Sequence, residues 1–322
     1  MVIGDMMLDR FIWGRVRRIS PEAPVPVVEV ERESCQPGGA SNVVNNIGAL
    51  GARTCMVGVV GSDADGQILR DELSRAGVEV SGIAIDSDRP TAVKTRVVAH
   101  SQQVVRVDRE ARGPLSERTH QKIESSAAKE SPFVDAVVFS DYSKGVLSRR
   151  LVEVVCESTL HRGVPVLGNA KPGNLDLFRG ITMVSLNLSE AEAAVGFEID
   201  GEASLSRAGL ALLRRVETRY ALITLGARGL ALFTSGLEAP FRVPAINVPV
   251  YDVSGAGDTV ISTLALALSA GSDARTAANL ASMAAGTVVR KFGVATASRD
   301  EIVALYRELA EGLVTYHPQE LG

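Results

Sequence analysis

Hydrophobic residues in the second half of the chain form short continuous runs separated by amphipathic stretches. The runs predicted to be strands are residues 136–139, 164–167, 182–186 and 221–225. The stretches between them have the apolar spacing of helices, over residues 151–160, 189–195 and 205–216. Buried strands that alternate with helices are typical of a parallel sheet covered on both faces. The pattern therefore predicts an α/β fold.

The first third of the chain has a different pattern. Residues 1–4 read as a strand that runs into an Asp-rich turn at 5–9, and residues 10–32 have strand-like composition. Pro21, Pro24 and Pro26 exclude a helix or a central strand there. Residues 91–108 alternate like a hairpin with a polar turn. We expect segments of about 10–32 and 90–109 to pair as a small lid inserted in one domain that spans residues 1–322.

The other expected elements have recognisable ends. A helix opens at the Gly38-Gly39 pair and runs to about Leu50, where Gly51 stops it. The remaining predictions are a strand at 55–60 and helices at 65–76, 260–270, 273–290 and 299–311.

The stretch 252–259 is a glycine-rich turn that opens the most apolar helix of the chain. Unpaired backbone N–H groups at a helix start attract anions, and Gly255 and Gly257 let a phosphate approach the backbone. Asp258 puts a carboxylate inside that site, which suits a base that accepts a proton from a substrate hydroxyl during phosphoryl transfer. From this stretch alone, a helix-capping role for Asp258 is equally plausible.

Composition and charge narrow the class of protein. The 322 residues are 46% hydrophobic and carry a formal net charge of −4 without long single-sign blocks, so neither nucleic acid nor a membrane surface is expected as a partner. No apolar run is long enough to span a bilayer and no signal peptide is recognisable. We expect a cytoplasmic enzyme whose first strand starts a few residues earlier in the natural protein.

Four motifs occur in the order and spacing of the ribokinase-like (PfkB) carbohydrate kinases, which the chain resembles over essentially its whole length. They are Gly38-Gly39-Ala40-Ser41-Asn42, Asn187-Leu188-Ser189-Glu190, Thr224-Leu225-Gly226-Ala227-Arg228-Gly229 and residues 252–259. The resemblance implies a mostly parallel central sheet with helices on both faces and a small β-sheet lid. It also implies ATP and Mg²⁺ as cofactors, leaves a monovalent cation open, and implies a homodimer through the lid.

Longer strings resemble one group within this family, the kinases of D-glycero-D-manno-heptose 7-phosphate, which serve lipopolysaccharide synthesis. These strings lie at residues 4–9, 19–26, 94–96, 102–110 and 140–145. The resemblance implies transfer of the γ-phosphoryl group to the C1 hydroxyl of the sugar. No nucleotidyltransferase domain is expected, because the kinase pattern runs to about residue 315.

The resemblance also implies roles for individual residues. Asp258 is the expected base, with a pKa near or below about 4, and Gly255, Ala256 and Gly257 form the anion hole. Glu190 and Asn187 are expected at Mg²⁺, although the same pair reads without the resemblance as an ordinary helix cap. The residues expected at the nucleotide are Lys171, Asn187, Thr224, Gly226, Gly229 and Asn279. Those expected at the sugar phosphate are Asp5, Asp9, Gly39, Asn42, Lys94, Arg96, Arg106 and Lys144.

One departure from the heptose kinases keeps two alternatives open. Where they carry an Asp-Pro-Lys-Gly-like string, this chain has Gly168-Asn169-Ala170-Lys171, so a neutral side chain replaces a carboxylate. The alternatives are a kinase of another sugar or sugar phosphate and a non-catalytic regulator that binds sugar or nucleotide. The intact glycines and Asp258 argue against the regulator.

Overall fold

The computed structural model describes residues 1–100, 102–111 and 113–317. The strands of its main sheet are β1 (Val2–Gly4), β4 (Met56–Gly61), β5 (Ile83–Asp86), β8 (Val137–Ser140), β9 (Val166–Asn169), β10 (Met183–Asn187), β11 (Tyr220–Thr224), β12 (Leu230–Thr234) and β13 (Phe241–Val243). The helices are α1 (Ala40–Ala49), α2 (Ala64–Arg75), α3 (Glu117–Glu130), α4 (Arg149–Thr159), α5 (Leu188–Val195), α6 (Glu202–Val216), α7 (Ala256–Ser269), α8 (Ala274–Val288) and α9 (Arg299–Ala310). Short 3-10 turns are η1 (Ser131–Phe133), η2 (Leu160–Arg162), η3 (Pro172–Phe178) and η4 (Gly226–Arg228).

The main sheet has the spatial order β13-β12-β11-β10-β9-β8-β1-β4-β5. Neighbouring strands from β11 to β5 are parallel, whereas β12 and β13 continue the sheet in antiparallel fashion. The predicted α/β fold with a mostly parallel sheet is therefore confirmed.

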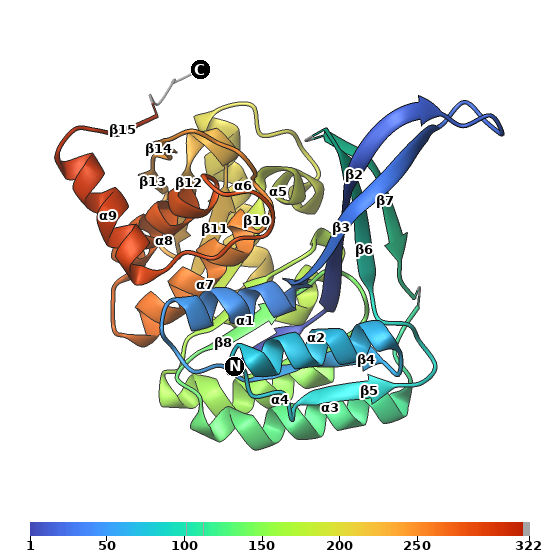
Figure 1. Cartoon of the computed structure of the whole chain (residues 1–322). Coiled ribbons are helices and arrows are strands. Elements are labelled where there is room, and N and C mark those ends of the chain that lie inside the picture. The colour runs from blue at the N-terminus through green and yellow to red at the C-terminus, as the bar shows by residue number, and fades with distance from the viewer. Residues whose placement is uncertain (101, 112, 318–322) are drawn as a thin grey trace.

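Helices cover both faces of this sheet, as Figure 1 shows. Successive strand residues point to opposite faces, so Val2 and Ile3 belong to different hydrophobic clusters. Helices α3, α4, α5 and α6 pack in the cluster of Ile3, and α1, α2, α7 and α8 pack in that of Val2. This burial on both faces explains the continuous apolar runs in the sequence.

The lid is a second sheet with the order β3-β2-β6-β7, and in Figure 1 it projects from the body as a curved arm. Its strands are β2 (Met6–Ile19), β3 (Pro26–Gly39), β6 (Val93–Ala99) and β7 (Gln102–Arg109). The predicted pairing of the two lid segments is found between β2 and β6, which run parallel. The first segment is longer than predicted, and Asp9 lies within β2 where a turn was expected.

The C-terminal part adds a small two-stranded sheet beside α8. Its strands are β14 (Ile246–Asn247) and β15 (Thr315–Tyr316), and Leu305 of α9 packs with Ile246 in one hydrophobic cluster. No helix in the described part of the chain is both long and apolar enough to cross a membrane.

The parallel strands place their carboxyl ends on one edge of the main sheet. Residues at or just after these ends are Asp5 after β1, Tyr142 after β8, Asn169 in β9, Asn187 in β10 and Thr224 in β11. Chain order changes direction between β1 and β8, and such switch points form the crevice in which ligands of open α/β sheets bind.

Candidate active site

Asp258 lies in the first turn of α7 and is buried. The helix begins after Gly255, whose left-handed φ of 80° favours glycine and where a Cβ atom would lie 2.8 Å from the Asn42 amide. One carboxylate oxygen of Asp258 accepts a hydrogen bond from Asn42 Nδ2 at 2.8 Å. The other accepts one from the Tyr142 hydroxyl at 2.9 Å. Two segments that are far from α7 in the sequence therefore fix this carboxylate.

Burial raises the pKa of Asp258 to about 6. The hydrogen bonds from Asn42 and Tyr142 act in the opposite direction, as does the charge of Lys171, while the charge of Asp9 adds to the rise. The predicted pKa near or below about 4 is wrong, because the prediction took account of the helix start but not of the burial that comes with it. A carboxylate with this higher pKa is a stronger base near neutral pH.

One of the three residues predicted for the anion hole has its donor occupied. The backbone N–H of Ala256 donates to Val253 O at 3.2 Å. Among the described residues, the backbone N–H groups of Gly255, Gly257 and Asp258 have no hydrogen-bond acceptor. A Cβ atom on Gly257 would meet no atom within 4 Å, so this glycine faces open space. The open donors therefore lie at Gly255, Gly257 and Asp258, in the turn that carries the candidate base.

Two adjoining cavities meet at Gly257 and Thr224, which line both. The first, of about 150 Å³, is polar and also contains Tyr142, Asn169, Lys171, Ser185, Asn187, Glu190 and Asp258 in its lining. The second, of about 280 Å³, is more apolar and is lined by residues of β11, η4, α7 and α8. A polar reaction chamber thus opens beside a larger compartment suited to an apolar ring.

Most of the predicted nucleotide residues line these cavities. Thr224, Gly226 and Gly229 border the larger one, and a Cβ atom on Gly229 would lie 2.0 Å from a backbone oxygen. Asn279 is absent from the lining, and its side-chain amide donates to Arg275 O of its own helix. The residues of α8 and its end that do border the cavity are Ser282, Ala285, Gly286 and Val289. The structure therefore gives no support to Asn279 at the nucleotide.

Asn187 and Glu190 form the helix cap that was one of the two interpretations. Asn187 Oδ1 accepts from the Glu190 backbone N–H at 2.9 Å, and a Glu190 oxygen accepts from the Asn187 N–H at 2.9 Å. The other oxygen of Glu190 pairs with Lys171, whose ammonium also lies over the Tyr142 ring. Because both residues line the polar cavity, capping and a role near phosphates are compatible.

Among the predicted sugar residues, Asp5 acts as a structural support. Both oxygens of Asp5 accept backbone N–H groups, from Tyr142 at 2.8 Å, Lys144 at 3.0 Å and Val146 at 3.2 Å. Burial raises the pKa of Asp5, and these hydrogen bonds oppose the rise. Asp5 therefore anchors the loop after β8, and the structure does not show it free to bind a sugar. Gly39 has a φ of 58° and starts α1, which carries Asn42 into the site.

The lid cations share one face of their sheet. Lys94 and Arg96 lie two positions apart on β6 and therefore on the same face of the sheet, and Arg96 lies directly opposite Arg106 on β7. Arg96 forms an ion pair with the buried Asp9, whereas Arg106 pairs with Asp108 on its own strand. The predicted cations of the lid are thus on one side, and Arg96 is the one that pairs with a buried carboxylate.

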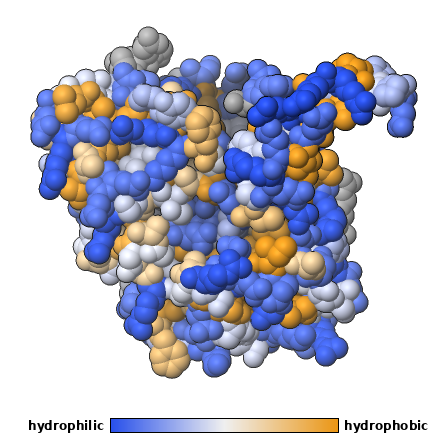
Figure 2. Space-filling model, in the orientation of Figure 1, coloured by the Kyte–Doolittle hydropathy of each residue, from blue (hydrophilic) through white to orange (hydrophobic). Residues whose placement is uncertain are grey.

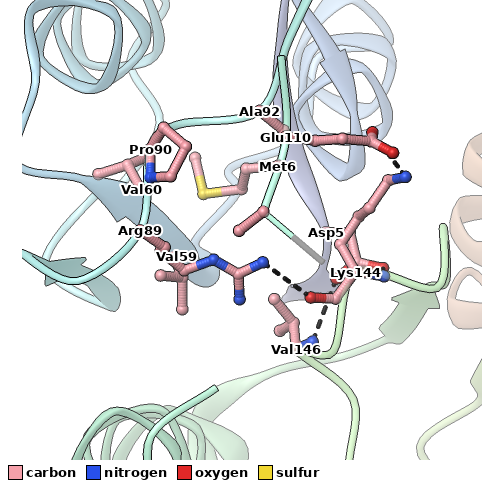
Figure 3. Close-up of a pocket in the computed structure, with 11 residues that line it drawn as sticks. Asp5, Met6, Val59, Val60, Arg89, Pro90, Ala92, Glu110, Lys144 and Val146 are labelled. Carbon is pink, nitrogen blue, oxygen red and sulfur yellow. Dashed lines mark hydrogen bonds and ion pairs between the residues drawn. The ribbon is translucent and has the colours of Figure 1, made fainter. Parts of the chain in front are cut away.

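Lys144 does not join this group. Its ammonium pairs with Glu110 at 2.6 Å in a separate small cavity (Figure 3), so the structure does not place it in the polar cavity with Asp258.

Sequence reasoning also missed two polar residues that support the site. Tyr142 contacts Asp258, and Asp141 accepts hydrogen bonds from the Lys171 N–H at 3.0 Å and from the Asn174 amide. Both belong to the string at 140–145 that signalled the resemblance. Their polarity directly after a buried strand was the available signal.

Comparison with solved structures shows that this molecule has the ribokinase-like fold. Phosphofructokinase-2 from Escherichia coli in complex with potassium aligns with a TM-score of 0.80 and 18% identity, over 96% of this chain and 99% of that one. Ribokinase from Arabidopsis thaliana complexed with ribose and ATP aligns with a TM-score of 0.71 and 20% identity, over 94% and 97%. These identities are low, so the likeness concerns the fold alone.

The chain belongs to the pfkB family of carbohydrate kinases, whose family model matches residues 1–301. It is 46% identical over 304 residues to the bifunctional protein HldE of Desulfatibacillum aliphaticivorans. That alignment covers 94% of this chain and 62% of the relative, so the chain spans less than two thirds of the relative's length.

Proposed function

We propose that this chain transfers the γ-phosphoryl group of ATP to the C1 hydroxyl of D-glycero-D-manno-heptose 7-phosphate, which gives the 1,7-bisphosphate. The observation that carries the proposal is that Asp258 and Gly257 line one cavity, because a base and open backbone donors there serve the two needs of phosphoryl transfer. The identity to HldE and the strings at 4–9, 102–110 and 140–145 support the heptose substrate.

The larger cavity suits the nucleoside of ATP, because its apolar walls suit a planar ring and its glycines let a ligand approach the backbone closely. Among the described residues, no cluster of three or more His, Cys, Asp or Glu side chains could hold a metal ion. Glu190, with the Asn187 amide nearby, would hold Mg²⁺ that keeps most of its waters. The bound ion would neutralise negative charge on the phosphates.

The chain's own groups then perform the reaction. Asp258 orients the attacking hydroxyl and accepts its proton, while Asn42 and Tyr142 keep the carboxylate in place. The N–H of Gly257 donates to the phosphoryl oxygens as negative charge redistributes. Lys171, which lines the same cavity, adds a cation opposite the base.

The lid suits a substrate that already carries a phosphate. Lys94, Arg96 and Arg106 share a face, and their anionic partners among the described residues are Asp9 and Asp108. Guanidinium groups bind phosphates by paired hydrogen bonds. We assign the 7-phosphate to this face of the lid.

The decisive experiment measures ADP release from Mg·ATP by purified protein. Heptose 7-phosphate is compared with unphosphorylated heptose, ribose, fructose and fructose 6-phosphate, and the Asp258→Asn variant controls for contaminating kinases. We expect turnover with heptose 7-phosphate and none above background in the variant. Turnover on another sugar alone would overturn the substrate but keep the base. No turnover on any sugar, with measurable binding, would favour the regulator.

We also propose that the protein acts in the cytoplasm, where ATP is supplied, as one kinase domain that dimerises through its lid. Figure 2 shows hydrophobic residues along the projecting arm. Exposed large hydrophobic residues of the lid include Ile19, Val25, Val30, Val105 and Val107. Such a group is typical of an interaction surface. Light scattering at micromolar concentration should give the mass of a dimer and, for Val105→Asp, that of a monomer, whereas a monomeric parent would contradict the lid interface.

A further inference from the structure

Tyr142 is the group outside the predicted set that touches the candidate base. Its hydroxyl donates to Asp258 at 2.9 Å, and its ring lies beneath the Lys171 ammonium. Burial raises the pKa of Tyr142 well above its ordinary value, and the negative charge of Asp258 adds to this rise. The phenol is therefore protonated at neutral pH and acts as a hydrogen-bond donor.

The loop that carries Tyr142 is attached to the end of β1. Asp5 accepts the backbone N–H groups of Tyr142, Lys144 and Val146, so three positions of the loop are fixed by one carboxylate. Ser143 in this loop has a left-handed φ of 56°, which shows how tightly the loop turns.

The same loop is held by both connections of the lid. Figure 3 shows the ammonium of Lys144 directed at Glu110, which follows β7, and the Arg89 guanidinium directed at the Lys144 carbonyl oxygen. Arg89 precedes β6 in the chain. A cavity of about 20 Å³ lies between these side chains and has room for about one water molecule. Both strands of the lid hairpin are thus joined to the loop at one residue.

We propose that Tyr142 is a positioning residue for Asp258 and that the Lys144–Glu110 pair transmits the position of the lid to it. The inference rests on the proposed function, in which Asp258 is the base. A sugar phosphate that draws in the lid then also sets the orientation of the carboxylate that receives its proton.

The sign of the expected effect follows from the groups around Asp258. Tyr142 and Asn42 donate to the carboxylate, Lys171 faces it with a positive charge, and Asp9 faces it with a negative one. Removal of the Tyr142 hydroxyl takes away a donor that favours the ionised form. Asp258 in Tyr142→Phe should therefore ionise at a higher pH than in the parent protein.

The first test follows the carboxyl carbon of Asp258 by ¹³C NMR in protein labelled at the aspartate side chains. The Asp258→Asn variant assigns the signal. We expect a midpoint of about 6 in the parent protein and a midpoint about one pH unit higher in Tyr142→Phe. An unchanged midpoint in a variant with parental thermal stability would overturn the positioning role.

The second test concerns the lid. Glu110→Gln should raise the Asp258 midpoint less than Tyr142→Phe does, and it should add nothing in the double variant, because both changes act through the same phenol. Glu124→Gln, which breaks an ion pair with Arg150 on α4, is the matched control and should leave the midpoint unchanged. A Glu110→Gln shift that persists without the Tyr142 hydroxyl would overturn the link.

Kinetics separate this inference from the proposed function. If the parent protein turns over heptose 7-phosphate, Tyr142→Phe should lower kcat with little change in KM for ATP. The acid limb of its plot of kcat against pH should move to higher pH, as the NMR midpoint does. If no sugar is phosphorylated, the proposed function fails. The NMR titrations would still decide whether Tyr142 positions Asp258.

Discussion

Asp258 is a residue whose placement favours chemistry over stability. Burial raises its pKa from 3.8 to about 6, so the folded protein binds this proton more tightly than the unfolded chain does. Its contribution to stability is therefore most favourable below pH 4 and falls as the pH rises toward 6. A difference of about two pH units corresponds to about 3 kcal/mol at most, before the protein relaxes.

The variant Asp258→Asn tests this balance. It should lose at least about a hundredfold in kcat, because a carboxamide accepts no proton. At pH 8 its thermal midpoint should exceed that of the parent, and at pH 4 the difference should vanish, since the parent is then protonated. Steady-state kinetics and thermal unfolding at both pH values check this. A variant that keeps parental kcat would contradict the assignment of the base.

The residue scale also shows what sequence alone reaches. Asp258 was found from its local setting, an acid in the first turn after a glycine pair. Its pKa was predicted wrongly, because the burial that raises it comes from packing with distant segments, such as those of Asn42 and Tyr142, which lie 216 and 116 positions away. The role of Asp5 was mispredicted for the same reason. Its carboxylate accepts the backbone N–H of Tyr142, which lies 137 positions later in the sequence. Local chemistry can be predicted, but long-range partners cannot.

At the scale of elements, the start of α7 brings together the donors of the anion hole. Gly257 has helical surroundings and open space at its Cβ position. In Gly257→Ala the added methyl group should stabilise the helix by about 0.5–1 kcal/mol. It should also obstruct the phosphoryl group and lower kcat by about tenfold or more. Thermal unfolding and steady-state kinetics measure the two effects.

Gly48→Ala provides the matched control for this prediction. Gly48 lies in helix α1 and, like Gly257 in α7, has no atom within 4 Å of an added Cβ. This variant should gain similar stability with unchanged kinetics. Equal kinetics for Gly257→Ala and Gly48→Ala would show that no phosphate approaches the start of α7.

Elements with a clear pattern of hydrophobic and polar residues were predictable, and elements with a weak pattern were not. The predicted strand at 182–186 corresponds to β10 (Met183–Asn187). It was predictable because its residues are buried on both faces of the sheet and form a continuous apolar run. Helix α3 (Glu117–Glu130) was missed because its sequence is largely polar and it buries only Thr119, Ile123 and Ala127. The antiparallel strands β12 and β13 were missed because the alternation of strand and helix ends at β11.

At the scale of the whole molecule, the proposed sugar site lies between two bodies, the main sheet and the lid. Besides the loop at Lys144, the lid is joined to the body at Asp65 of α2. This buried carboxylate forms ion pairs with Arg10 of β2 and Arg109 of β7. The two arginines come from different strands of the lid, so Asp65 fixes the angle at which the lid leaves the body.

Asp65→Asn should therefore affect the two substrates differently. With weaker attachment, the lid presents Arg96 and Asp9 less precisely, and KM for the sugar phosphate should rise by about tenfold. KM for ATP should stay constant, because β11, η4, α7 and α8 build the larger cavity without the lid. Faster hydrogen exchange in β2 and β7 should accompany the change.

The exposed ion pair of Asp176 with Arg215 supplies a control for this prediction. The variant Asp176→Asn should leave both KM values unchanged. An equal rise in both KM values for Asp65→Asn would mean that the carboxylate supports the fold as a whole, and that the lid does not move as a separate body.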